Sequence, residues 1–171
     1  MESPECLSFI SVAGMNRPKI KDATHIADDL IEGTKNKMRT ILRIGLRHGH
    51  DSLVLGALGC GAYRNPPSHI AKLFHEVFEE PEFKNKYRLI SFAILDDHNT
   101  HKAQNPEGNY KPFADEFTET ENKKSDPSPE VLKALMMWKM GAGNSAKRFN
   151  GENPIPVSYT HLRAHETKAN L

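Results

Sequence analysis

A glycine-rich segment in the first half of the chain has the residue types of an anion-binding loop. Residues 55–67 read Leu-Gly-Ala-Leu-Gly-Cys-Gly-Ala-Tyr-Arg-Asn-Pro-Pro. Gly59 and Gly61 allow the backbone to approach a ligand closely and to present its N–H groups to an anion. We expect Asn65 to cap the following helix, with Pro66 in its first turn, so that the positive end of the helix dipole faces the same space. This arrangement suits a diphosphate; a tight turn that only needs a positive φ is the structural alternative.

Histidines and acidic residues offer a second kind of chemistry, metal binding. The pairs are His48 with His50 and His98 with His101, the latter next to Asp96 and Asp97. Their spacings match no strong zinc pattern. His48 and His50 also fall at a predicted helix end, where histidine complements the helix dipole. We therefore predict no metal site and no cofactor.

Nucleophilic or acid catalysis has few candidates. Cys60 precedes a predicted helix N-terminus, which favours a thiolate, but a base such as His69 or His98 would have to lie within hydrogen-bond reach, and no spacing indicates this. Glu79 and Glu80 close the exposed end of a predicted helix, where a solvated pair is expected. We predict no catalytic residue in this chain.

The elements that position these residues follow from hydrophobic patterning. The nearly continuous apolar runs at 7–13, 52–58 and 89–95 predict buried strands, the second one covered on both faces. Apolar residues at helical spacing predict a helix over 23–48 and a second one over 70–78. The alternating order predicts an α/β fold, a three-layer α/β/α sandwich.

Beyond residue 96 the pattern weakens. We expect a polar loop over 97–109, with a turn at 105–109, and a short helix over 110–117. Residues 119–129 are predicted to form a charged linker, and residues 130–156 a C-terminal helix and loop.

Composition excludes several classes of protein. The 171 residues carry a formal net charge of +1, which argues against direct nucleic-acid or membrane-surface binding. No apolar run is long enough to span a bilayer, and the N-terminus has no signal-peptide pattern. Two cysteines cannot form a disulfide framework. We expect a reduced, cytoplasmic or nuclear protein.

Residues 157–171 lack helical and strand periodicity. The string VSYTHLRAHET resembles the translation of a transposase-type sequencing adapter. We therefore expect residues 157–171 to be an artefactual tail that takes no part in the fold. A polar, histidine-containing disordered tail is the alternative.

The glycine-rich loop and its flanks resemble a known family. LVLGALGCGAYRNPP, with IAKLFHEVF and SFAILDDHN after it, is similar to the microbial-type poly(ADP-ribose) glycohydrolases, which are macrodomains. LSFISVAGMNRP resembles the strand before this family's long helix. The resemblance covers roughly residues 7–117, so residues 1–118 are expected to be a partial macrodomain. It implies a mixed sheet between helices and a site for ADP-ribose, free, in poly(ADP-ribose) or on ADP-ribosylated proteins.

The resemblance also implies site residues. The diphosphate-binding loop would consist of Gly59, Cys60, Gly61, Ala62, Tyr63, Arg64 and Asn65. Tyr63 would pack beside a ribose. Further residues expected near the pocket are Val12, Ala13, Asn16 and Asp96. Asp96 opens a polar stretch, 96–99, that would border the adenosine side.

One departure from the family bears on activity. These glycohydrolases share a Gly-Gly-Gly stretch followed by Gln-Glu-Glu, and one of those glutamates is the general acid; this chain contains neither motif. We therefore expect an N-terminally truncated macrodomain that binds ADP-ribose without hydrolysing polymer. A non-enzymatic ADP-ribose reader module and a fragment without function are the alternatives, and the oligomeric state is open.

Overall fold

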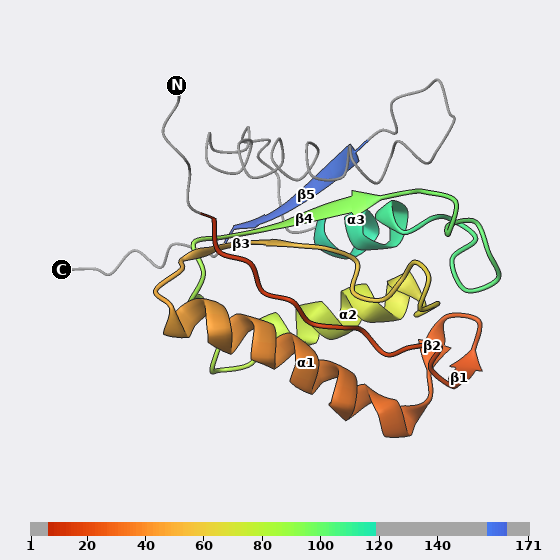
Figure 1. The fold of residues 1–171 in the computed structure, drawn as a ribbon, viewed down its shortest axis with the longest axis horizontal. Coiled ribbons are helices and arrows are strands. Elements are labelled where there is room, and N and C mark those ends of the chain that lie inside the picture. The colour runs from red at the N-terminus through yellow and green to blue at the C-terminus, as the bar shows by residue number, and fades with distance from the viewer. Residues whose placement is uncertain (1–6, 119–156, 164–171) are drawn as a thin grey trace.

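The computed structural model describes residues 7–118 and the backbone of residues 157–163 (Figure 1). The predicted linker 119–129 and the predicted C-terminal helix and loop 130–156 lie outside the described residues. The strands are β1 (Ile20–Asp22), β2 (His25–Ile26), β3 (Ser52–Leu55), β4 (Leu89–Leu95) and β5 (Val157–Arg163). The helices are α1 (Asp28–Arg47), α2 (Pro67–Phe78) and α3 (Tyr110–Thr118).

A mixed sheet organises the described chain. β3 pairs in parallel with β4, from Ser52 opposite Leu89 to Leu55 opposite Phe92, and β5 pairs antiparallel on the other side of β4. β1 and β2 form a separate two-stranded hairpin. The α/β class and the mixed sheet predicted from the sequence are confirmed.

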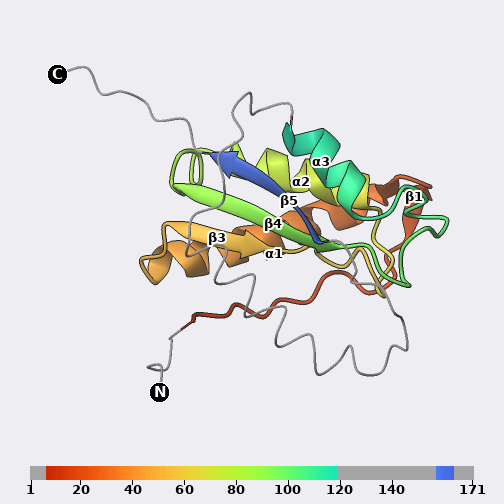
Figure 2. The same ribbon diagram turned by 90° about the horizontal axis from the view of Figure 1, so that it is seen from above.

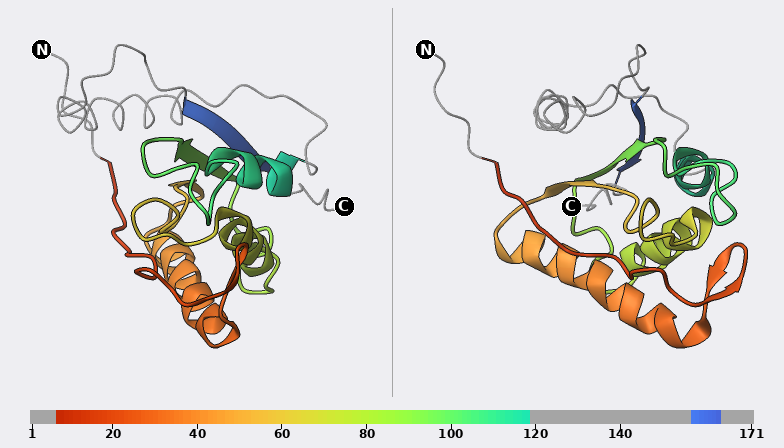
Figure 3. Two further views of the ribbon diagram at one scale, coloured as in Figure 1. Left: turned by 90° about the vertical axis from the view of Figure 1, so that its right-hand side faces the viewer. Right: turned by 45° about the vertical axis from the view of Figure 1, so that its right-hand side comes forward.

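Aromatic side chains join the helices to the sheet. Phe92 of β4 is fully buried, and its ring centroid lies 5.4 Å from Phe74 of α2, 5.0 Å from Phe113 and 4.9 Å from Phe117 of α3. Such pairs each contribute about 0.5–1.5 kcal/mol beyond area burial. α1, α2 and α3 thus cover one face of the sheet (Figures 2 and 3). A second helical layer, as in a three-layer sandwich, is not among the residues that the structure describes.

Helix α1 packs closely against the start of the sheet. A Cβ at Gly45 would lie 3.2 Å from the Leu53 side chain and closer still to the Tyr87 hydroxyl, which donates a hydrogen bond to the Leu42 carbonyl. Glycine is therefore needed at this helix position. On the polar side of α1, Arg39 forms a bidentate ion pair with Glu80, with both N–O distances 2.7 Å.

Three local predictions differ from the structure. Residues 7–13 run without a strand partner among the described residues, and Phe9 is 86% exposed. A run of apolar residues indicates β propensity, but a strand forms only where the edge of another strand is free to pair with it. The predicted strand 52–58 is shorter in the structure, because β3 ends at Leu55. The side chain of Val54 is 42% exposed, so β3 is not covered on both faces. α1 begins at Asp28 instead of residue 23, because Asp22 accepts hydrogen bonds from the backbone N–H and the hydroxyl of Thr24 and turns the chain into the hairpin.

The predicted tail contributes a strand. Val157–Arg163 pairs with the whole of β4, from Val157 opposite Leu95 to Arg163 opposite Leu89, so the expectation that this segment has no strand structure is wrong. An open sheet edge presents unpaired N–H and C=O groups that any β-prone segment can satisfy. No helix among the described residues is long and apolar enough to cross a membrane.

Candidate functional site

The glycine-rich loop lies where the carboxyl ends of β3 and β4 meet. Residues 56–66 connect β3 to α2, and the chain leaves β4 at Leu95 beside them. A Cβ built on Gly61 would lie 3.8 Å from the Cβ of Asn99. Ligands of open α/β sheets bind at this edge of the sheet. The sequence prediction therefore places the loop correctly with respect to the strands.

Three successive amides of the loop are available to a ligand. The N–H groups of Cys60, Arg64 and Asn65 donate within the loop, to the carbonyls of Ala57, Gly61 and Gly59, each at 3.0 Å. In the described part of the chain, no acceptor lies within hydrogen-bond distance of the N–H groups of Gly61, Ala62 and Tyr63. Consecutive unpaired amides in a turn are the donors that a phosphate oxygen needs. We call residues 61–63 the amide turn.

Two glycines let a second segment cross the loop in contact with it. Gly59 has φ +74°, and a Cβ there would lie 2.5 Å from the Asn65 amide nitrogen. A Cβ on Gly14 would lie 2.8 Å from the Cα of Gly59. Neither position has room for a side chain. We call residues 14–17, which cross at this point, the strap.

Asn65 joins the strap to the loop. Its side chain is fully buried, and its Nδ2 donates to the carbonyls of Met15 at 2.7 Å and Gly59 at 2.8 Å. The prediction that Asn65 caps α2 is wrong, because Pro66 is the N-cap residue and no side chain caps this helix. A cap would accept helix N–H groups through Oδ1, but two consecutive prolines remove two of those donors. Nδ2, the donor of the same amide, binds the two carbonyls.

Asn65 also has one acceptor without a partner. Among the described residues, no donor lies within hydrogen-bond distance of its buried Oδ1. Leaving such an atom unsatisfied costs about 1–3 kcal/mol. This atom lies in the residue that holds the two walls of the site together.

Backbone strain is concentrated where the strap meets the loop. The N–H of Arg17 donates to the carbonyl of Tyr63 at 2.8 Å. Arg17 and Arg64, on the two sides of this bond, have φ +47° and +59°. The left-handed conformation costs a non-glycine residue roughly 1–2 kcal/mol. Strained residues of this kind gather at functional sites.

The additional predicted residues differ in their positions. Ala13 and Asn16 flank the contacts of the strap and are exposed, and Val12 is half-buried against the core. Asp96 accepts hydrogen bonds from the backbone N–H of Asn109 at 2.6 Å and of Tyr110 at 3.2 Å, and so satisfies the first turn of α3. Within the stretch 96–99, Asn99 lies opposite the loop, because a Cβ built on Gly61 would be 3.8 Å from the Cβ of Asn99. The sequence did not separate these two roles.

The cysteine does not fit the role of nucleophile. Cys60 is fully buried, and this burial raises the pKa of its thiol far above the ordinary value. Its Sγ lies 3.8 Å from the carbonyl of Leu58. The expected stabilisation of a thiolate is therefore wrong, since desolvation outweighs any favourable helix dipole.

The acidic and histidine candidates occupy structural positions. A carboxylate oxygen of Glu79 lies 2.6 Å from the Lys84 ammonium. Glu80 forms an ion pair with Arg39, and this lowers the pKa of the Glu80 carboxyl. Both glutamates are therefore in ion pairs and are not only solvated. His48 is the C-cap residue of α1, as predicted. Across the described residues, no three histidine, cysteine, aspartate or glutamate side chains gather in a way that could hold a metal ion.

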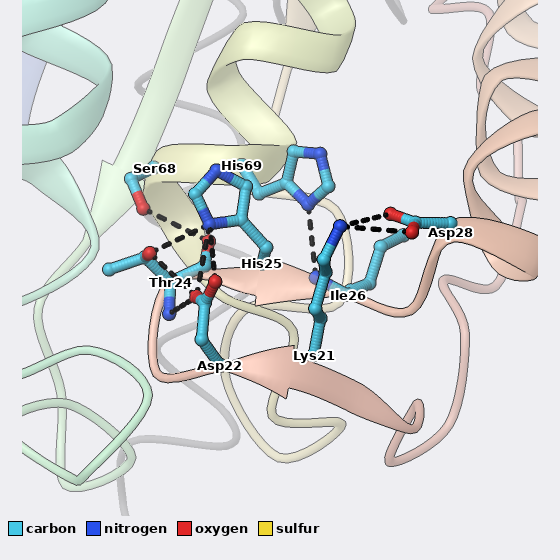
Figure 4. Close-up of polar contacts among 8 residues, drawn as sticks. All are labelled: Lys21, Asp22, Thr24, His25, Ile26, Asp28, Ser68 and His69. Atoms are coloured by element: carbon cyan, nitrogen blue, oxygen red, sulfur yellow. Dashed lines mark hydrogen bonds and ion pairs between the residues drawn. The ribbon is translucent and has the colours of Figure 1, made fainter.

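A buried histidine anchors the hairpin that follows the strap (Figure 4). Nδ1 of His69, in the first turn of α2, accepts a hydrogen bond from the Ile26 N–H at 3.0 Å. The ring of His25 lies 4.8 Å from that of His69, and His25 Nδ1 is 3.0 Å from an Asp22 oxygen. Burial, and secondarily His25, lowers the pKa of His69. Nothing in the spacing of residues 26 and 69 indicates this contact, so it could not be predicted from the sequence.

The acceptor role of His69 fixes its protonation. A nitrogen that accepts a backbone N–H carries no proton, so the neutral ring bears its proton on Nε2 and offers no lone pair there to a metal ion. Since Lys19 accepts the N–H of Ala27 through its carbonyl, the hairpin is closed at its base next to the strap. His69 therefore helps to position the strap.

Comparison with known proteins finds similarity only among solved structures. No family model and no curated protein matches the chain. Poly(ADP-ribose) glycohydrolase from Deinococcus radiodurans is similar in its apo form, with 27% identity and a TM-score of 0.45. The same enzyme in complex with ADP-ribose is similar with 28% identity and a TM-score of 0.44. Each match covers 53% of this chain and 34% of the other, so the chain spans about a third of the length of the structures it matches.

Proposed function

We propose that this protein binds ADP-ribose, with the diphosphate on the amide turn between the strap and residues 96–99. The observation that carries the proposal is the run of three N–H groups, at Gly61, Ala62 and Tyr63, that have no partner among residues 7–118, while the N–H groups of their neighbours are hydrogen-bonded within the loop. The sequence GCGAYRNPP around them, which resembles the microbial-type glycohydrolases, supports a diphosphate as the ligand.

The surroundings of the amide turn favour an anion. α2 begins directly after the loop, and its N-terminus contributes a positive partial charge of about half an elementary charge. Arg17 of the strap and Arg64 of the loop add two full positive charges where the two segments meet. Tyr63, which is 40% exposed, offers a ring to pack beside a ribose. These features support the site without any net positive charge on the whole protein.

We do not extend the proposal to cleavage of the polymer. The adjacent glutamates of the described residues, Glu79 and Glu80, are in ion pairs, and the chain has no Gln-Glu-Glu sequence. Glycoside cleavage needs a carboxyl group that can protonate the leaving oxygen. The function that the geometry supports is binding, as in a reader of ADP-ribose marks.

Titration calorimetry of the full chain with ADP-ribose tests this proposal. We expect saturable binding, and we expect Gly61→Val to abolish it because a branched side chain would cover the amides. The fold should tolerate this substitution, since the added Cβ would make only an ordinary contact at 3.8 Å. Thr40→Val, at an exposed position of α1, is the control for placing the same side chain outside the site.

The possible outcomes separate the alternatives. Binding that Gly61→Val leaves intact would place the ligand elsewhere and refute the site. A folded protein that binds no ADP-ribose would support the fragment without function. Release of ADP-ribose from polymer would show an activity that the described carboxylates do not explain.

A further inference from the structure

The strap and the loop bring two arginines to the same point of the site. The hydrogen bond from the Arg17 N–H to the Tyr63 carbonyl, 2.8 Å long, makes Arg17 a spatial neighbour of Arg64. Both residues are exposed. The amide turn ends at Tyr63, directly before Arg64. Two guanidinium groups on long side chains thus start from positions next to the unpaired amides.

These two arginines have no counter-ion in the described part of the chain. In contrast, the guanidinium groups of Arg39, Arg43 and Arg88 lie 2.7, 2.6 and 2.9 Å from carboxylate oxygens of Glu80, Glu82 and Asp51. An anion bound between these two side chains would supply the counter-charge that both lack among the described residues. Guanidinium groups bind phosphate oxygens in pairs of parallel hydrogen bonds.

The backbone at both positions is unsuited to arginine. A left-handed turn is best filled by glycine, which adopts positive φ without a steric penalty. Arg17 is also followed by Pro18, which restricts the residue before it further. No contact that the structure describes for either side chain offsets this strain. Arginine at positions 17 and 64 is explained if the guanidinium groups bind a ligand instead of stabilising the fold.

We propose that Arg17 and Arg64 form a clamp for a second phosphate, which makes the site selective for diphosphates over monophosphates. One phosphate binds to the N–H groups of the amide turn, and the next binds between the two guanidinium groups. The clamp rests on the proposed function and deepens it. The backbone N–H groups would bind any phosphate, and the two arginine side chains would make the site prefer a diphosphate to a monophosphate.

The strain provides the test, because glycine at either position removes the charge and relieves the backbone. We measure melting temperature and affinity for ADP-ribose and for AMP with Arg17→Gly and Arg64→Gly in the full chain. Each variant should melt a few degrees higher and bind ADP-ribose roughly tenfold more weakly, with a much smaller loss for AMP. Asn85→Gly is the matched control, since Asn85 has φ +59° outside the site; it should not lose affinity for either ligand.

Several results would overturn the clamp. Equal losses for ADP-ribose and AMP would show general attraction instead of selectivity, and unchanged affinities would show no role at all. A lower melting temperature in both variants would show that the arginines serve the fold.

Titration of the wild-type chain with inorganic pyrophosphate and phosphate separates the clamp from the proposed function. If ADP-ribose does not bind but pyrophosphate binds more tightly than phosphate, and Arg64→Gly removes this preference, the clamp stands and ADP-ribose is the wrong ligand. If pyrophosphate and ADP-ribose both fail to bind, clamp and function are both wrong.

Discussion

Two neighbouring regions of this molecule are held together by different forces. Around β4, the aromatic cluster of Phe74, Phe92, Phe113 and Phe117 buries apolar surface between α2, α3 and the sheet. At the carboxyl ends of β3 and β4, strap and loop are joined by backbone carbonyls, one buried amide side chain and two closely apposed glycines. Apolar burial is non-directional and large in sum, whereas single hydrogen bonds contribute modestly and depend on geometry. Substitutions in the site can therefore abolish binding while the protein stays folded, whereas substitutions in the aromatic cluster destabilise the whole fold.

The largest effect is expected in the aromatic cluster. Phe92→Ala should lower the free energy of unfolding by about 3–5 kcal/mol, because it removes a fully buried ring and leaves a cavity. Urea denaturation followed by circular dichroism measures this loss. Phe92→Leu should lose less, since it fills part of the space. A loss below about 1 kcal/mol for Phe92→Ala would show that the cluster is not the stabilising core.

A smaller effect on stability, but a large one on binding, is expected at Asn65. Asn65→Ala should cost roughly 2 kcal/mol, because two buried hydrogen bonds from its Nδ2 are lost and the carbonyls of Met15 and Gly59 remain without them. The strap should separate from the loop, and ADP-ribose affinity should fall along with stability. Denaturation and calorimetry on the same sample check both effects. A variant that keeps full affinity would contradict the account of the strap.

Asn99→Ala is the control for this prediction. Asn99 also borders the loop, but its amide contacts the side chains of its neighbours Asp97 and His98. It should therefore cost less stability than Asn65→Ala. Equal losses of unfolding free energy in Asn65→Ala and Asn99→Ala would show that the hydrogen bonds between strap and loop do not stabilise the protein more than other contacts of the loop.

The smallest effect is expected from pH, through His69. The fold lowers the pKa of this side chain below its ordinary 6.5, mainly by burial, with contributions from His25 and Lys72 that lower it and from Glu76 and Asp22 that raise it. The neutral ring is therefore favoured in the folded state. Its contribution to stability is fully present above pH 6.5 and is lost as pH falls through that value toward the lower folded pKa.

The substitution His69→Asn isolates this contribution. Asparagine can accept the Ile26 N–H through its Oδ1 but does not titrate. Denaturation at about pH 7 and about pH 5 should show a smaller loss of stability in the variant than in the wild type, by an amount on the order of 1 kcal/mol or less. The same pH dependence in both proteins would mean that His69 does not anchor the hairpin through a neutral ring.

The core was predictable from the sequence, and the details of the site were not. The spacing of Ile70, Leu73, Phe74, Val77 and Phe78 indicated α2, and the apolar run 89–95 indicated β4, because periodic burial leaves a local pattern. The position of the loop after β3 followed from the same pattern. The strand expected at 7–13 and the strand found at 157–163 show that pairing depends on which edge is free, which no local pattern reports.

The contacts of Asn65 and His69 show where sequence reasoning ends. Asn65 before two prolines has the form of a helix cap, yet its amide binds a carbonyl fifty positions earlier in the chain. His69 accepts a backbone N–H from a residue that is 43 positions away. Such contacts are set by how the strap and the hairpin fold back on the loop. They require the tertiary structure.

The most direct test of the central claim is to observe the loop amides while ligand is added. In ¹⁵N–¹H correlation spectra of the full chain titrated with ADP-ribose, the account predicts the largest shifts at the backbone amides of Gly61, Ala62 and Tyr63. The amides of the aromatic cluster should stay in place. Saturable binding with shifts elsewhere and none in the amide turn would contradict the account.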